Sequence, residues 1–194
     1  MPRSAVRSSC LLLGCALALG VGAQGLPPPP PTPPDPAGLA RVAIGLIEYT
    51  RWPGPPRPRQ LCLATAGPLG RDVLAALRAD PDRVPSLVPR ELPVDSMPPD
   101  DCDVLLMGGW QDAAARSVLA TLDGRPVLSI GMGPQACSQG ALFCLLPRPP
   151  APPGAAPAAP GGPRFAGMAD VIRRSGLIVS SRVMQLARPV EGRP

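Results

Sequence analysis

The stretch Asp103-Val-Leu-Leu-Met-Gly108 places four consecutive apolar residues between an acidic residue and a glycine, a pattern typical of a buried β-strand. Similar short apolar stretches precede it, Leu61-Cys-Leu-Ala-Thr-Ala66, and follow it, Pro126-Val-Leu-Ser-Ile-Gly131. Segments with helical character fill the two intervals, over 69–79 and 111–121. Because strands that alternate with helices form parallel sheets with right-handed crossovers, we expect an α/β fold.

Two further elements are predicted on the N-terminal side of Asp103. Apolar residues recur at intervals of three and four over 38–51, which indicates an amphipathic helix that stops at Trp52-Pro53. Residues 86–94 are extended but contain prolines, which cannot donate a hydrogen bond to a neighbouring strand. We therefore place 86–94 at an edge of the sheet.

The last third of the chain predicts an antiparallel hairpin followed by two helical segments. These strands and helices are expected at 141–146, 164–168, 169–175 and 179–188. Gly176 separates the two helices, and Ser180 or Ser181 can cap the second one. The fold expected from the whole pattern is one small α/β domain, with a mostly parallel sheet flanked by helices and a C-terminal hairpin and helix.

The first 23 residues have the layout of a secretory signal peptide, with Arg3 and Arg7 followed by an apolar run of about fourteen residues. Small residues precede a cleavage point after Ala23. The run is shorter than the roughly 20 apolar residues that a membrane-spanning helix needs. An uncleaved anchor is one alternative, and a lipoprotein signal is another, because Leu12-Leu-Gly-Cys15 resembles a lipobox. We expect cleavage after Ala23 and export.

Two proline-rich segments are predicted not to pack. Residues 24–37 form a linker that contains five consecutive prolines and is expected to be extended and stiff. Residues 148–163 are a Pro/Ala/Gly-rich insertion, which we interpret as a long exposed loop. The domain itself is expected over 38–190.

Removal of the signal peptide leaves four cysteines, at 62, 102, 137 and 144. An even number of cysteines in an exported chain predicts two disulfides. A zinc site is disfavoured because the chain has no histidine and the thiols do not form close pairs. Free buried thiols are the remaining alternative.

Four cysteines allow three pairings, and the sequence layout favours one of them. Cys137 and Cys144 can bond if the chain turns back at Gly140, because a disulfide needs Cα atoms within about 7 Å. Cys62 and Cys102 each lie at the start of a predicted strand, and parallel neighbours that start level would bring them together. We expect the strand crosslink to matter more for stability, and the local crosslink to shape a surface turn that affects partner binding or redox response.

Composition argues against several classes of function. Without histidine or lysine the usual catalytic bases are missing, so we expect no enzyme, cofactor or bound metal. The 19 basic residues include Arg3 and Arg7, which leaves the mature chain with 17 arginines against 14 acidic residues, too mild an excess for nucleic acid. The acidic cluster Asp100-Asp-Cys-Asp103 is interpreted as a solvated turn rather than a cation site.

The two tryptophans are the candidate contacts for a partner or a ligand. Trp110 follows Gly108-Gly109 at the carboxyl end of a predicted strand, the edge where ligands bind in α/β sheets. Trp52 follows the first helix and more often packs beneath such a helix end than contacts a partner.

Several of these stretches together resemble the YfiR-like family of periplasmic proteins, over about residues 40–190. The stretches that carry the resemblance are Glu48-Tyr-Thr-Arg-Trp-Pro53, Leu61-Cys-Leu63, Cys102-Asp-Val-Leu-Leu106, Pro126-Val-Leu-Ser-Ile130 and the tail from Arg164-Phe165 to Ala187. The chain departs from the family where Phe165-Ala-Gly-Met-Ala169 replaces a Phe-Glu-Ile-Asn type segment, and in its long loop.

The resemblance implies a non-enzymatic periplasmic regulator. The founding member represses a membrane diguanylate cyclase by binding its periplasmic part, which limits cyclic-di-GMP synthesis, and an outer-membrane-anchored partner relieves the repression. The implied partners are thus a membrane signalling protein and an outer-membrane-anchored antagonist. Apart from the resemblance, we expect a soluble monomer or homodimer. The alternative function is a small-molecule sensor or carrier that uses the crevice near Trp110 and Gly131.

Overall fold

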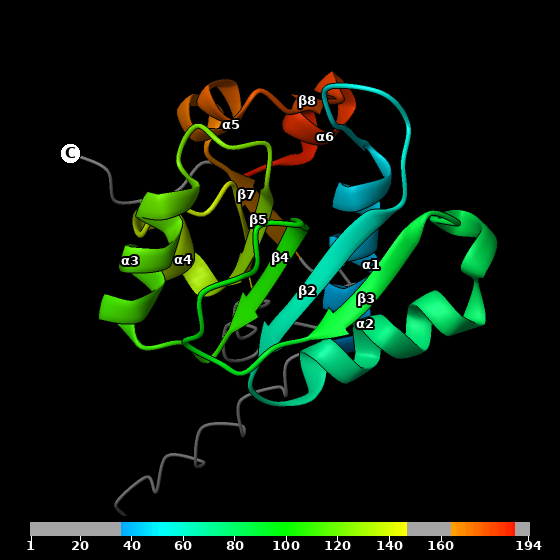
Figure 1. Cartoon of the computed structure of the whole chain (residues 1–194), viewed down its shortest axis with the longest axis horizontal. Helices are drawn as coiled ribbons and strands as arrows, with labels where there is room; N and C mark the ends of the chain where they lie inside the picture. The colour runs from blue at the N-terminus through cyan, green and yellow to red at the C-terminus, as the bar shows by residue number, and fades with distance from the viewer. Residues whose placement is uncertain (1–35, 147–163, 189–194) are drawn as a thin grey trace, which may run out of the picture. The chain divides into compact units, whose positions relative to one another are not determined.

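The computed structural model describes residues 36–146 and 164–188 (Figure 1). The expected signal peptide over 1–23, the linker before Pro36 and the loop over 148–163 lie outside the described residues. The helix α1 already begins at Pro36, inside the segment that was expected to be linker.

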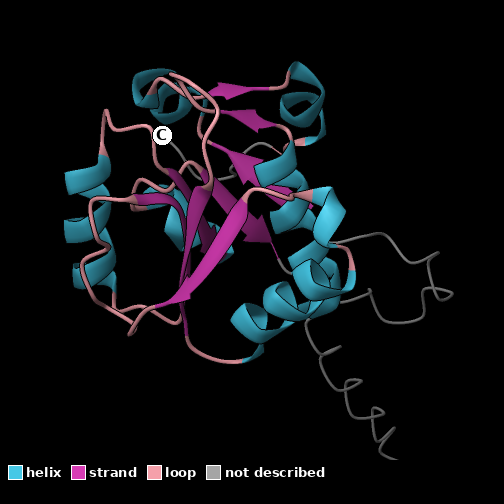
Figure 2. Ribbon diagram, turned by 45° about the vertical axis from the view of Figure 1, so that its right-hand side comes forward, coloured by secondary structure: helices cyan, strands magenta, loops and turns pink. Residues whose placement is uncertain are grey.

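Most of the described chain is organised around one sheet, whose strands are magenta in Figure 2. This sheet has six strands, in the order β3-β2-β4-β5-β6-β7. Its strands are β2 Arg59–Thr65, β3 Leu87–Glu91, β4 Cys102–Gly108, β5 Leu128–Met132, β6 Phe143–Leu146 and β7 Arg164–Gly167. All neighbours are parallel except β6 and β7, which form the predicted antiparallel hairpin. The structure therefore confirms the mostly parallel sheet, and β3, which contains Pro89, lies at an edge as the prolines of 86–94 predict.

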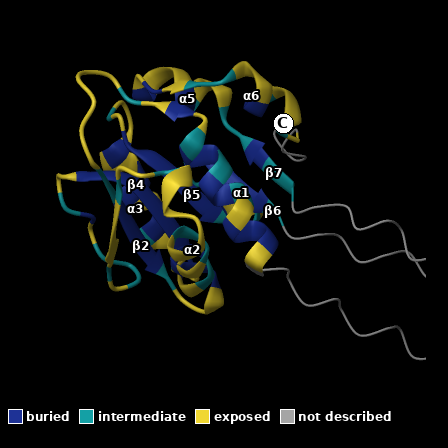
Figure 3. Cartoon of the chain, turned by 90° about the vertical axis from the view of Figure 1, so that its right-hand side faces the viewer, coloured by how far each residue is buried: buried dark blue, intermediate teal, exposed yellow. Residues whose placement is uncertain are grey.

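Helices cover both faces of this sheet. They are α1 Pro36–Glu48, α2 Pro68–Ala79, the short 3-10 helix η1 Pro81–Arg83, α3 Asp112–Leu122, α4 Gly133–Ser138, α5 Ala169–Ser175 and α6 Ser181–Leu186. Residues of α1 and α2 pack on one face, and residues of α3 and α4 pack on the other. The C-terminal helices α5 and α6 are exposed over much of their surface (Figure 3).

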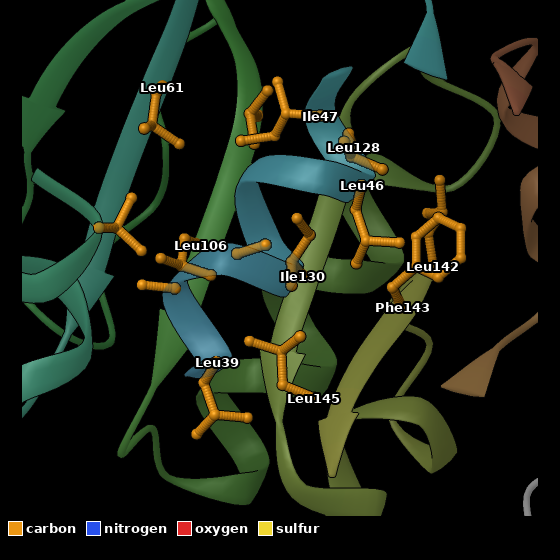
Figure 4. Packing of buried hydrophobic residues seen from close by; sticks show 14 of the residues in the cluster. Leu39, Leu46, Ile47, Leu61, Leu106, Leu128, Ile130, Leu142, Phe143 and Leu145 are labelled. Carbon is orange, nitrogen blue, oxygen red and sulfur yellow. The ribbon is translucent and has the colours of Figure 1, made fainter. Parts of the chain in front are cut away.

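Two apolar clusters, one on each face, hold the sheet between the helices. Leu61, Leu106, Ile130 and Phe143 point toward α1 (Figure 4). Their neighbours along the strands, such as Leu105, point toward α3 instead. All seven residues of β4 are buried, so the continuous apolar run of this strand has a physical cause: a central parallel strand is covered on both faces.

A second, two-stranded sheet was not predicted from the sequence. Its strands β1, Thr50–Arg51, and β8, Ile178–Val179, pair antiparallel. The prediction of helix through residue 51 is therefore wrong in its last turn, because the backbone leaves the helix after Glu48 to pair with β8. The buried Thr50 hydroxyl donates to the carbonyl of Leu46, 2.7 Å away, and secures this exit.

Of the two C-terminal helices, α5 matches the expected 169–175, whereas α6 begins later than expected. Gly176 ends α5 with a φ of 73°, a left-handed conformation that glycine adopts without strain. Residues 178–179 then form β8, so the helix expected over 179–188 is shortened to α6. Ser180 occupies the N-cap position of α6, but its side chain makes no capping hydrogen bond, which corrects the expected role.

No helix within the described residues, 36–146 and 164–188, is long and apolar enough to cross a bilayer.

Candidate functional site

A hollow with a volume of about 560 Å³ lies beside the end of α1. Five of its lining side chains define what we call the arginine groove: Arg51, Trp52, Arg57, Arg59 and Arg83. They come from β1, from the segment between β1 and β2, from the first residue of β2, and from η1. The groove thus forms at the ends of β2 and β3 where these strands begin, opposite the edge that the sequence analysis favoured.

Asp103 lies behind the arginine groove, with an exposed fraction of 3%. Its carboxylate accepts two hydrogen bonds from Arg57, at 2.8 and 2.5 Å, and one from Arg59, at 3.3 Å. It also accepts the backbone N–H of Gln60 at 2.8 Å. The interpretation of the whole cluster as a solvated turn is therefore wrong for this residue, although Asp100 and Asp101 do form exposed ion pairs.

An irregularity in strand pairing explains why Asp103 points inward. Gln60 of β2 pairs with Cys102, and the next residue, Leu61, pairs with Val104. Asp103 is therefore the extra residue of a bulge, and bulges re-aim side chains. Its carboxylate replaces a strand partner for the N–H of Gln60.

Trp52 both packs and lines the groove. Its indole Nε1 donates to the carbonyl oxygen of Asp103 at 3.3 Å, and the Arg59 guanidinium lies over its ring, 5.3 Å from the centroid. The side chain also packs against the apolar cluster beneath α1. The expectation that Trp52 packs at a helix end is met, and one part of it still faces the hollow.

The charges around the groove favour an anion. The guanidinium of Arg83 pairs with the carboxylate of Glu48 at 2.9 Å. Arg51 donates to the backbone carbonyl of Glu48 at 3.2 Å and forms no ion pair within the described part of the chain. Four guanidinium groups thus face two carboxylates, those of Glu48 and Asp103. A carboxylate or phosphate would find an uncompensated partner here.

Trp110 lies at the other end of β4, so the structure does not bring the two tryptophans together. It follows the carboxyl end of the strand, as predicted, and its Nε1 donates to the carbonyl of Ala64 at 2.5 Å. The hollow beside it has a volume of only about 170 Å³ and includes Met107 and Met132. Gln139 donates to Asp112 at 2.9 Å within the same lining.

A second groove, between α1 and α6, has a volume of about 300 Å³ and an apolar lining. We call it the apolar groove and define it by Val42, Tyr49, Phe165, Val183 and Leu186. Tyr49 is 47% exposed and Leu186 is 71% exposed. Sequence reasoning missed this groove, because its walls come from helices at opposite ends of the domain. The apolar positions on the outer side of α1 were its only signal.

The structure contains the two disulfides that the sequence favours, Cys62–Cys102 and Cys137–Cys144, with Cα–Cα distances of 6.0 and 5.6 Å. The two cysteines of the first pair are not level in the register. Cys102 begins β4 and lies opposite Gln60, whereas Cys62 lies opposite Leu105. All four cysteines are buried in the cluster beneath α3 and α4.

The expectation that the second disulfide shapes a surface turn is wrong, because the bond itself is buried. Cys137 and Cys144 are 1% and 0% exposed, so this bond ties α4 to β6 inside the core. Among residues 36–146 and 164–188, no three His, Cys, Asp or Glu side chains are grouped so that they could hold a metal ion.

Comparison with known families gives a match over more than half of the chain. Residues 39–149 fit the model of a family described as YfiR/HmsC-like. The matched span contains most of α1, the sheet from β2 to β6, both disulfides and the whole arginine groove. The elements β7, β8, α5 and α6 follow it in the chain, and β7 and α6 supply one wall of the apolar groove.

Proposed function

Because the chain belongs to the YfiR/HmsC-like family, we propose that it is a periplasmic regulator that binds the periplasmic part of a membrane signalling protein. The partner we propose is a membrane diguanylate cyclase, whose synthesis of cyclic-di-GMP is limited by the bound protein. An outer-membrane-anchored antagonist that relieves this repression, and a homodimeric regulator, belong to the same proposal. A role of this kind needs a docking surface and no catalytic residue.

The observation that carries the proposal is the apolar groove. Two large side chains, Tyr49 and Leu186, stand exposed on either side of it. Aromatic and aliphatic anchors next to an apolar depression are typical of protein-binding surfaces, and a groove between two helices suits an amphipathic partner helix. The pairing of β1 with β8 fixes the separation of the two walls.

Two observations support the periplasm as the compartment. Both disulfides are buried within the core, and disulfides of this kind form and persist in oxidising compartments. The predicted signal peptide over residues 1–23 supplies the export route.

A binding measurement tests this proposal. The mature protein is titrated against the periplasmic domain of the membrane diguanylate cyclase encoded nearest to its gene. We expect Tyr49→Ser and Leu186→Ser each to weaken binding by about tenfold or more, because anchor residues dominate such interfaces. Val88→Ser is the matched control, since Val88 is 48% exposed on the edge strand β3, away from the groove.

The cellular measurement complements the titration. Expression of the wild-type protein should lower the cyclic-di-GMP level of cells that contain the cyclase, and the two groove variants should not. Unaltered binding by both groove variants would show that docking uses another surface. A cyclase whose output is the same with and without the protein would contradict the proposed repression itself.

A second candidate function is the sensing of a small anionic molecule in the arginine groove. The specific observation in its favour is the uncompensated guanidinium of Arg51 beside Trp52, in a hollow of about 560 Å³. The 170 Å³ hollow near Trp110 offers less room for a ligand.

Thermal shift assays with small carboxylates and phosphates test whether the arginine groove binds an anion. Stabilisation that Arg51→Gln abolishes, and that Arg116→Gln on the exposed side of α3 retains, would support it. A screen in which no anion raises the melting temperature would contradict it.

A further inference from the structure

Asp103 is a buried carboxylate with an unusually complete set of donors. Two guanidinium groups and one backbone N–H bind its oxygens, and it is 3% exposed. Stability alone is a weak explanation for such an arrangement, because the cost of removing charges from water offsets much of the attraction between them. The groups that Asp103 holds point to a different role.

Each side chain that Asp103 holds is a lining residue of the arginine groove. Its carboxylate binds Arg57 and Arg59, and its carbonyl oxygen accepts the Trp52 indole N–H. One residue thus sets the position of one whole wall. Arg57 shows the effect most clearly, since its side chain is 52% exposed and would sample many conformations without this bidentate pair.

Ion pairing also determines which guanidinium group in the groove is available to bind an anion. Arg57 and Arg59 are engaged by Asp103, and Arg83 is engaged by Glu48. Of the four lining arginines, Arg51 is the one that forms no ion pair within the described residues. The groove therefore presents one available guanidinium next to an indole ring, although four arginines surround it.

We propose that Asp103 is a positioning residue of the arginine groove, which orders Trp52, Arg57 and Arg59 and leaves Arg51 to receive the anion. The groove is thereby matched to a group with one negative charge, such as a carboxylate, rather than to a polyanion. This inference rests on the proposed anion-binding role of the groove. Without Asp103, two more guanidinium groups would turn toward the hollow and attract anions less selectively.

The fluorescence of Trp52 reports on this directly. In full-length mature protein with Trp110→Phe as the parent, Trp52 is the sole tryptophan. Iodide quenches it as an anionic probe, and acrylamide quenches it as a neutral probe of comparable access. The ratio of the two quenching constants measures how strongly the groove concentrates anions, and simple loosening of the structure raises both constants together.

Three substitutions then separate the outcomes. Asp103→Asn should raise the iodide-to-acrylamide ratio about twofold, because it releases two guanidinium groups. Asp101→Asn is the matched control: it removes the same charge from an exposed pair with Arg90 and should leave the ratio unchanged. In the parent, Arg51→Gln should lower the ratio clearly, whereas Arg57→Gln should change it little. This last comparison keeps Asp103 intact, so it remains informative if Asp103→Asn fails to fold.

The two proposals fail in distinguishable ways. No effect of Arg51→Gln would overturn the anion site itself. A clear effect of Arg51→Gln combined with an equally large effect of Arg57→Gln would overturn only the positioning role, because Arg57 would then already be available to anions. An equal rise of both quenching constants in Asp103→Asn would show a purely structural role.

Discussion

Gly131 of β5 and Ala136 of α4 lie so close together that a methyl group on the glycine would overlap the alanine side chain. The short helix α4 therefore rests directly on the sheet. This contact also places Cys137, the next residue of α4, where it reaches Cys144 on β6. A glycine in one strand thus sets the geometry of a disulfide to the neighbouring strand.

Gly131→Ala should destabilise the domain by about 1–3 kcal/mol, because the added methyl group must push α4 away from β5 in a fully packed core. Urea denaturation followed by circular dichroism measures the change. An unchanged unfolding midpoint would show that α4 can move away from the sheet at no cost.

Gly45→Ala provides the opposite case. Gly45 lies inside α1, and the nearest heavy atom to an added Cβ would be an Arg83 side-chain nitrogen 4.0 Å away. Since glycine costs a helix about 0.5–1 kcal/mol relative to alanine, this substitution should raise stability by a similar amount. A loss of stability in the same denaturation assay would contradict the helical environment of residue 45.

Removal of the two disulfides should have unequal effects. In the chain-entropy model, the bond between residues 62 and 102 contributes about 4 kcal/mol and the shorter 137–144 bond about 2.5 kcal/mol. We compare the double variants Cys62→Ala/Cys102→Ala and Cys137→Ala/Cys144→Ala, since alanine suits sites that are this buried. Denaturation gives the free energies of unfolding, and peptide maps without reductant confirm the remaining bond. A larger loss from the second variant would reverse the expected order.

The N-terminus of the exported protein stays a prediction from the sequence. Signal peptidase should cut after Ala23, which leaves Gln24 as the first residue. Intact-mass measurement of protein from the periplasmic fraction tests this. A diacylglyceryl group on Cys15 would instead make the protein a membrane-anchored lipoprotein.

The sequence predicts the main sheet well because buried parallel strands are continuous apolar runs. β2, β4 and β5 all coincide with such runs, and Pro89 marks β3 as an edge strand. The helix α4 was missed because Gly133-Pro134 at its start has the composition of a turn. β1 and β8 were missed because two-residue strands are too short to show any periodicity.

The candidate site was harder to predict than the fold. Asp103 belongs to an acidic stretch that has the composition of a solvated turn. Only the bulge beside Cys102 directs its side chain inward. Trp52 and Trp110 were found from the sequence, but the arginines around Trp52 belong to segments that meet only in the folded sheet. Leu186 could not be paired with Tyr49 for the same reason, because their proximity depends on the β1–β8 pairing.

That pairing has a consequence for how the protein matures. Thr50 and Val179 lie near opposite ends of the domain sequence, yet they pair with each other across the β1–β8 sheet. A chain that crosses the inner membrane from its N-terminus must wait with β1 unpaired until residue 179 has emerged. The helix α6, which forms one wall of the apolar groove, emerges later still. In the proposed function, in which the exported protein docks through the apolar groove, a partly translocated chain therefore has no complete docking surface, and only fully translocated molecules bind the partner.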